Sequence, residues 1–194
     1  SRHSFPTRRS SDLGLGTSDK SRRILQATLE NVEVPCVVDA DGLNLLSAHS
    51  RYMKNLVRGQ FIFTPHMKEM SRITSKSVEE LRNSRMEILK QFAGEYDVTC
   101  VLKDARTCIF SPGEHPFVNL SGNAAMAKAG SGDVLAGVIT GLLAQKMSCF
   151  DAAVLGVYLH GLAGDEAKRE KGSYSVLARD LAENIGTVLK RLEE

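Results

Sequence analysis

The sequence contains no tryptophan, only five prolines, and almost no excess of charge of either sign. Its 25 basic and 23 acidic residues give a formal net charge of +2. The overall charge therefore gives no reason to expect nucleic acid or an anionic membrane as a partner. Any binding of phosphate groups must depend on a local arrangement of residues.

The four cysteines do not have the spacing of a metal site or a redox motif. Cys36, Cys100, Cys108 and Cys149 are far apart, with no C-x-x-C pair and no matching histidines. We interpret them as reduced thiols, which are typical of a cytoplasmic protein.

Long hydrophobic runs are also missing. The most apolar stretch, residues 134–144, contains two glycines and is shorter than the about 20 residues that a membrane-spanning helix needs. We therefore expect no membrane segment.

Residues 1–13 differ in character from the rest of the chain. They are rich in arginine and serine, contain Pro6 and show almost no apolar periodicity. A targeting segment of this composition would form an amphipathic helix, which Pro6 opposes. We interpret residues 1–13 as a non-native or disordered segment. Residues 14–194 are then the C-terminal portion of one domain, truncated at its N-terminus but still long enough to bury a core.

Three short apolar segments, residues 36–38, 61–63 and 99–102, have the composition of strands buried inside a parallel sheet. Each is followed by polar groups, and ligands of open parallel sheets bind at the carboxyl ends of the strands. The sequence therefore predicts a rim of polar side chains formed by Asp39, Asp41, His66 and Lys103.

Helical patterns separate and follow these strands. They cover residues 19–31, 42–48, 77–92, 133–145, 151–168 and 178–192. Residues 106–119 instead predict short strands around a turn at residues 111–114, which suits an antiparallel edge. This alternation of strands and helices predicts a three-layer α/β fold with a mostly parallel central sheet.

The most informative segment is residues 119–145, in which Gly130-Ser131-Gly132-Asp133 leads into an apolar-periodic helix. Small residues allow backbone N–H groups to approach an anion, and the helix N-terminus adds partial positive charge. Asp133 has two interpretations. It is either an ordinary acid at a helix N-terminus or a general base acting on a hydroxyl that faces a nucleotide phosphate.

Five separated segments together resemble one family. They are Gly14-Leu15-Gly16, residues 38–44, Thr64-Pro65-His66 followed by Glu69, residues 103–107 and residues 119–145. In this order they resemble the NAD(P)H-hydrate dehydratase family of the ribokinase-like superfamily, from Gly14 to the C-terminus. Gly-Ser-Gly-Asp alone would fit sugar, thiazole and hydroxymethylpyrimidine kinases equally well.

The resemblance implies a ribokinase-like sandwich that uses ADP or ATP with Mg²⁺ to phosphorylate the hydroxyl of hydrated NADH or NADPH (NADHX or NADPHX). Loss of the phosphate then restores NADH or NADPH. It implies Asp133 as the catalytic base, and contacts to the hydrate from Gly16, Asp39, His66, Asn123 and Asp133. It implies a nucleotide site made by Lys103, Asp104, Ala105, Arg106, Thr107, Gly130, Ser131 and Gly132, and assigns no residue as a metal ligand. Members commonly form homo-oligomers, and many carry an epimerase domain upstream.

Several of these residues have a structural alternative. His66 and Asp41 could each cap the following helix, and Lys103 could lie on the surface. Asn119 and Asn123 could serve only to hold a turn. His160, on an apolar helical pattern, is expected to have a packing role.

Asp104 departs from the family pattern, which usually has glycine at this position. Aspartate tolerates a positive φ better than most residues, but its carboxylate would stand close to a polyphosphate. We expect Arg106 to offset this charge.

Two other functions remain open from the sequence. One is a small-molecule kinase of the same fold, which would keep the phosphate on a hydroxymethylpyrimidine or thiazole product. The other is an inactive nucleotide-binding fragment that lacks N-terminal strands.

Overall fold

The computed structural model describes residues 15–193. The segment 1–13 and Gly14 lie outside the described residues. In chain order the elements are α1 (Asp19–Asn31), β1 (Cys36–Val38), α2 (Ala40–Ala48), η1 (Ser50–Asn55), β2 (Phe61–Phe63), α3 (Met67–Thr74), α4 (Val78–Asn83), α5 (Arg85–Tyr96), β3 (Thr99–Leu102), β4 (Cys108–Phe110), β5 (Phe117–Val118), η2 (Ala124–Met126), α6 (Ser131–Ala144), α7 (Cys149–Lys171) and α8 (Ala178–Glu193).

The strands form one five-stranded sheet in the order β1-β2-β3-β4-β5. β1 pairs with β2 and β2 with β3 in parallel, whereas β3 with β4 and β4 with β5 pair antiparallel. Only β4 therefore runs against the other four strands. The prediction of a mostly parallel sheet with an antiparallel edge is confirmed.

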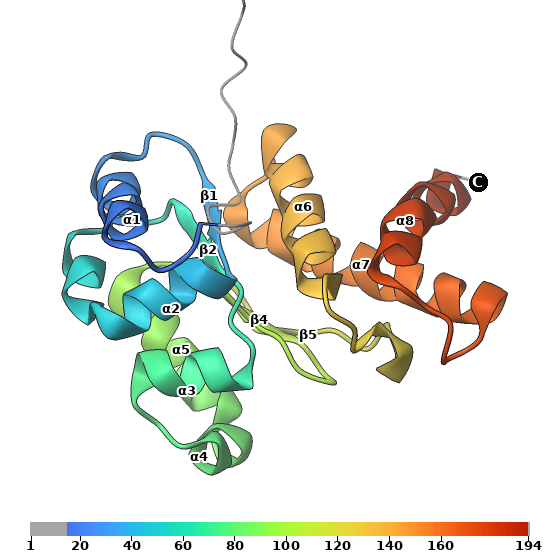
Figure 1. The fold of residues 1–194 in the computed structure, drawn as a ribbon, viewed down its shortest axis with the longest axis horizontal. Helices are drawn as coiled ribbons and strands as arrows, with labels where there is room; N and C mark the ends of the chain where they lie inside the picture. Colours follow the sequence, from blue (N-terminus) through green and yellow to red (C-terminus); the bar gives the residue numbers. More distant parts are fainter. Residues whose placement is uncertain (1–14, 194) are drawn as a thin grey trace, which may run out of the picture.

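Helices cover both faces of this sheet, which gives three layers (Figure 1). Alternate strand residues point to opposite faces. Val38, Phe63 and Leu102 belong to one buried cluster, which also contains buried apolar residues of α1 to α5. Val37, Ile62 and Val101 belong to a second cluster with α6 and α7. The carboxyl ends of β1 to β3 thus emerge between two helical layers.

The C-terminal helix lies outside the second layer. Val188 of α8 packs with Leu159 and Ala163 of α7 in a smaller apolar cluster. No helix within residues 15–193 has the length and apolar character needed to cross a membrane.

Two local predictions were wrong. The helix expected at residues 77–92 is two helices, α4 and α5, because the backbone at Ser84 leaves the helical region with φ −126° and ψ 38°. Asn83 and Ser84 are both residues whose side chains compete for local backbone hydrogen bonds. Asp41 is not the cap of its helix, because α2 begins at Ala40 and Asp41 lies in its first turn.

Glycines of α7 allow the segment that precedes α6 to lie directly on the helix. A Cβ at Gly161 would stand 2.0 Å from Ser121 Oγ and 2.9 Å from the Ser121 backbone carbon. The Ser121 hydroxyl also donates to the Tyr158 carbonyl at 3.2 Å. Residues 119–122 therefore have a place against α7 only because residue 161 has no side chain.

We expect Gly161→Ala to lower the free energy of unfolding by about 1–3 kcal/mol, the usual cost of overpacking. Gly137→Ala in α6 is the matched control, because Gly137 is exposed and a Cβ there would meet nothing within 4 Å. That change should stabilise by roughly 0.5–1 kcal/mol through helix propensity. Urea denaturation of both variants measures the difference, and equal effects at the two sites would contradict the packing argument.

Candidate functional site

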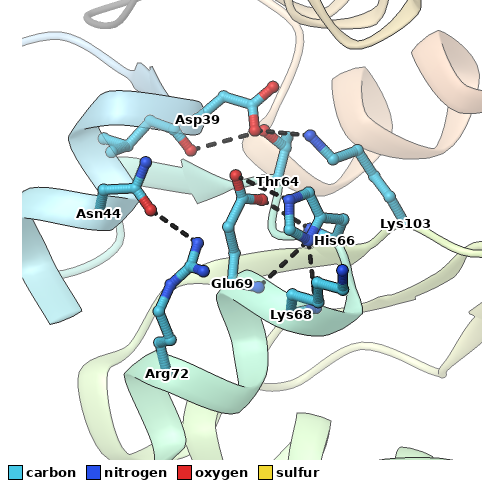
Figure 2. A network of polar contacts seen from close by, with 9 residues as sticks. Asp39, Asn44, Thr64, His66, Lys68, Glu69, Arg72 and Lys103 are labelled. Carbon is cyan, nitrogen blue, oxygen red and sulfur yellow. Dashed lines mark hydrogen bonds and ion pairs between the residues drawn. The ribbon is translucent and has the colours of Figure 1, made fainter. Parts of the chain in front are cut away.

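The polar rim predicted at the strand ends is present, and its centre is an ion pair. Lys103, directly after β3, reaches Asp39, directly after β1, with 2.6 Å between Nζ and Oδ1 (Figure 2). The Asp39 side chain is only 4% exposed and that of Lys103 20%. Asp39 stands at the N-cap position of α2, but its carboxylate caps no N–H group of that helix. The carboxylate forms its ion pair with Lys103 instead.

The glycine-rich turn before α6 lies against this ion pair. Gly130 has φ +87°, a left-handed conformation that favours glycine, and α6 begins at Ser131. A Cβ on Gly132 would stand 3.5 Å from Lys103 Nζ and 3.6 Å from Asp39 Oδ2. Asp133, the next residue, is exposed in the first turn of α6. The first turn of a helix also presents backbone N–H groups that have no partner within the helix. The site thus combines donors for an anion with an exposed carboxylate.

His160 contacts the glycine-rich turn from α7. It lies on α7, is 8% exposed, and its Nε2 is 3.3 Å from the Ser131 hydroxyl. Burial lowers the pKa of His160 from 6.5 to about 4, although a backbone hydrogen bond with Ser131 opposes the shift, and the charge of Lys103 adds to it. The ring is therefore neutral near pH 7. The expected packing role is accompanied by a polar contact to the turn.

This pKa makes stability depend on pH with a definite sign. Between about pH 6.5 and pH 4 the unfolded chain binds a proton at His160 and the folded chain does not. This group should therefore lower the free energy of unfolding by up to about 1.4 kcal/mol per pH unit as pH is lowered through this range. His160→Gln should reduce that slope, which urea denaturation at pH 7, 6 and 5 measures. An unchanged slope in the variant would show that other groups cause the acid sensitivity.

Gly16 is held at the same edge of the sheet. Its backbone N–H donates to Asp41 Oδ2 at 3.0 Å, and its φ is +70°. Between the two acids of the rim, Ala40 has φ +42°. Such a conformation costs a residue with a side chain about 1–3 kcal/mol and occurs preferentially at functional sites. On its two sides, Asp39 pairs with Lys103 and Asp41 accepts from the Gly16 N–H.

His66 caps α3, as the structural alternative predicted. Its Nδ1 accepts hydrogen bonds from the backbone N–H groups of Lys68 and Glu69, each at 3.1 Å. The side chain is nevertheless 48% exposed. His66 also forms a parallel bridge with Lys103, whose N–H donates to the Pro65 carbonyl at 2.8 Å. The cap therefore places an accessible ring at the rim, and its contact to substrate stays a prediction.

In the loop after β3, the charge of Asp104 has a different partner from the one expected. Asp104 forms an ion pair of 2.9 Å with Arg85 of α5, so Arg106 is not the residue that offsets it. Asp104 is also not among the residues with positive φ. Ala105 and Arg106 are exposed, and the Thr107 hydroxyl donates to the Asp104 carbonyl at 3.3 Å. Sequence reasoning missed Arg85 because it lies 19 positions from its partner.

Asn119 and Asn123 both hold the backbone before the turn. The Asn119 amide donates to the Ser121 carbonyl at 3.0 Å, and Asn123 caps η2 by accepting from the Ala125 N–H. Asn123 also donates to Asp165 of α7 at 2.8 Å, and Asp165 accepts from the Gly122 N–H at 2.9 Å. Asp165 was not found from the sequence, because no local motif marks a partner more than 40 positions away.

Within residues 15–193, no group of three or more His, Cys, Asp or Glu side chains is placed to hold a metal ion. The first turn of α6 presents backbone N–H groups that suit an anion, and the exposed carboxylate of Asp133 suits a polar substrate. A glycine-rich helix N-terminus that faces the carboxyl ends of parallel strands is typical of nucleotide sites in α/β folds.

Comparison with solved structures identifies the class as ribokinase-like. A ribokinase-like superfamily protein from Enterococcus faecalis superposes with a TM-score of 0.76 at 32% identity, over 92% of this chain and 61% of that one. The family follows from the sequence: the chain belongs to the NAD(P)H-hydrate dehydratase family, whose profile matches residues 13–187.

Two relatives show the extent of the match. The chain is 41% identical over 181 residues to the bifunctional NAD(P)H-hydrate repair enzyme Nnr of Moorella thermoacetica, covering 93% of this chain and 34% of that protein. The ADP/ATP-dependent NAD(P)H-hydrate dehydratase from Bacillus subtilis, co-crystallised with ATP/Mg²⁺, superposes with a TM-score of 0.78 at 29% identity. That superposition covers 92% of this chain and 62% of the Bacillus chain. The chain thus spans about a third of the first relative's length and less than two thirds of the second's.

Proposed function

We propose that the protein to which this chain belongs restores NADH and NADPH from their hydrates by a dehydration that ADP or ATP drives. The observation that carries the proposal is the exposed carboxylate of Asp133, one residue after the turn that lies on the Asp39–Lys103 ion pair. Membership of the NAD(P)H-hydrate dehydratase family supports this assignment over the other chemistries of the fold.

In the proposed reaction, the hydroxyl oxygen of the hydrate attacks the terminal phosphorus of the nucleotide. Asp133 accepts the proton that this hydroxyl loses. The bond to the bridging oxygen breaks, and ADP yields AMP whereas ATP yields ADP. Backbone donors of residues 130–132 stabilise charge on the transferred group. Phosphate is a better leaving group than hydroxide, and the lone pair of the ring nitrogen assists its departure. Loss of a proton from the adjacent ring carbon restores the double bond.

Mg²⁺ fits this site as a companion of the nucleotide, because it is commonly held by phosphate oxygens with one or two carboxylates. Asp133 is the exposed carboxylate nearest the turn in sequence. When bound, the ion would neutralise charge on the phosphates. Lys103 to Thr107 would contact the nucleotide, and Gly16, Asp39, His66 and Asn123 the hydrate.

The remaining expectations concern the whole protein. We propose a homo-oligomer in the cytoplasm, joined to an epimerase domain, with residues 14–194 as the dehydratase portion. The word bifunctional in the name of the Moorella relative is compatible with such a fusion.

The test is the formation of NADH from NADHX, followed by absorbance, with ADP or ATP and Mg²⁺. Inorganic phosphate should appear in step with NADH. A small-molecule kinase of the same fold would instead leave an organic phosphate, and its appearance without NADH would overturn the proposal.

A further inference from the structure

Glu69 is a buried carboxylate whose two oxygens both face one residue, His66. Its side chain is 7% exposed. Oε2 accepts a hydrogen bond from the His66 backbone N–H at 2.8 Å, and Oε1 lies 3.3 Å from His66 Nε2 (Figure 2). The carboxylate therefore contacts both the backbone and the ring of the histidine.

The contacts of the ring determine which nitrogen carries its proton. His66 Nδ1 accepts from two backbone N–H groups, so in a neutral ring the proton is on Nε2. The distance of 3.3 Å from Nε2 to Glu69 is longer than that of a good hydrogen bond. Glu69 Oε1 therefore holds the Nε2–H group through a weak contact, and the same N–H remains able to donate to a second acceptor.

A second capping box in the same chain shows that the cap alone does not need a histidine. At α4, Ser77 accepts from the Glu80 N–H at 3.1 Å, and Glu80 accepts from the Ser77 N–H at 2.7 Å. Serine performs there the capping function that His66 performs at α3. What His66 adds is a half-exposed imidazole beside Lys103, at the rim of the site.

We propose that Glu69 is a positioning residue that orients the His66 ring, so that Nε2–H donates to an acceptor oxygen of the hydrated nicotinamide substrate. This inference rests on the proposed function for the identity of the substrate. Glu69→Gln tests this role, because glutamine replaces one of the two carboxylate oxygens by an NH₂ group. At either position the NH₂ group faces another hydrogen-bond donor, the backbone N–H or the Nε2–H of His66. The variant therefore keeps the shape of Glu69 and disturbs the ring.

The kinetic experiment measures KM for NADHX and for nucleotide, with kcat, in four proteins: wild type, Glu69→Gln, His66→Ser and the double variant. Serine keeps the cap of α3 and removes the ring. We expect Glu69→Gln to raise KM for NADHX about ten-fold, which corresponds to about 1.4 kcal/mol, and to leave KM for nucleotide unchanged. In the His66→Ser background the same change should have no further effect on KM. Additive effects would show that Glu69 acts independently of His66 and would overturn the proposal.

Glu80→Gln is the matched control for loss of a capping box, and it should leave both KM values unchanged. A second measurement does not depend on activity. The ¹⁵N shifts of His66 in NMR should show the Nε2–H tautomer in the wild type and a mixture in Glu69→Gln. An identical tautomer in both proteins would overturn the positioning role. If the wild type forms no NADH, the proposed function fails, and the NMR result still decides the role of Glu69.

Discussion

Asp133→Asn should lower kcat for nucleotide-dependent dehydration by about 10²–10⁴-fold, the usual contribution of a positioned general base. Asparagine has nearly the same shape but does not accept the hydroxyl proton. Because Asp133 is exposed in the first turn of α6, the change should cost stability only the interaction of a carboxylate with the helix dipole, about 0.3–1 kcal/mol. The measurement is the initial rate of NADH formation at saturating NADHX and nucleotide.

Asp19→Asn is the control for this substitution. Asp19 is also an exposed aspartate in the first turn of a helix, α1, where it pairs with Arg22 at 3.1 Å. Its loss should leave kcat unchanged within about two-fold, since surface ion pairs contribute little. Comparable rates in Asp133→Asn and wild type would remove Asp133 from the chemistry and leave it as an N-terminal helix acid.

Lys103→Met should lower the free energy of unfolding by about 3 kcal/mol, because it leaves the Asp39 carboxylate buried without its partner. The side chains are 4% and 20% exposed, so solvent screens the pair only weakly. Methionine keeps the length of the lysine stem, which separates the loss of charge from the loss of packing. Urea denaturation at pH 7 measures the change.

The double variant Asp39→Asn, Lys103→Met distinguishes an unpaired charge from a general defect. Removing both charges should restore the free energy of unfolding to within about 1 kcal/mol of the wild type, since replacing a buried pair is often close to neutral. If the double variant is as unstable as Lys103→Met, the loss of Lys103 acts through packing and not through an unpaired Asp39 carboxylate.

The sheet could be predicted from the sequence because its strands are short, apolar and fully buried. Residues 36–38, 61–63 and 99–102 coincide with β1, β2 and β3, and each is buried at every position. Their polar continuations then had to meet at one edge, since parallel strands end on the same side. The Asp39–Lys103 contact follows from this geometry, although the two residues are 64 positions apart.

The misses have a common physical origin in contacts between distant or locally competing groups. Ser84 interrupts a pattern whose apolar spacing continues through it, so periodicity alone joined α4 and α5. Arg85 reaches Asp104 and Asp165 reaches Gly122 through the packing of helices onto loops, which a linear pattern does not encode. The cap of α3 by His66 was one of the predicted alternatives, whereas the return contact of Glu69 was not, although an acid three residues after the cap is the signal of a capping box.

Both helical layers contribute side chains to the proposed site. His66 and Glu69 belong to the layer of α1 to α5, and the turn at residues 130–133 belongs to the layer of α6 and α7, with the sheet between them. Because close-packed interiors transmit strain, a packing change around α3 would be felt at the turn through Lys103, whose Nζ lies 3.5 Å from the Cβ position of Gly132. A change of acceptor molecule would therefore require matched substitutions in both layers, since Asn123 and Asp133, which are also proposed contacts of the hydrate, lie on the side of α6 and α7.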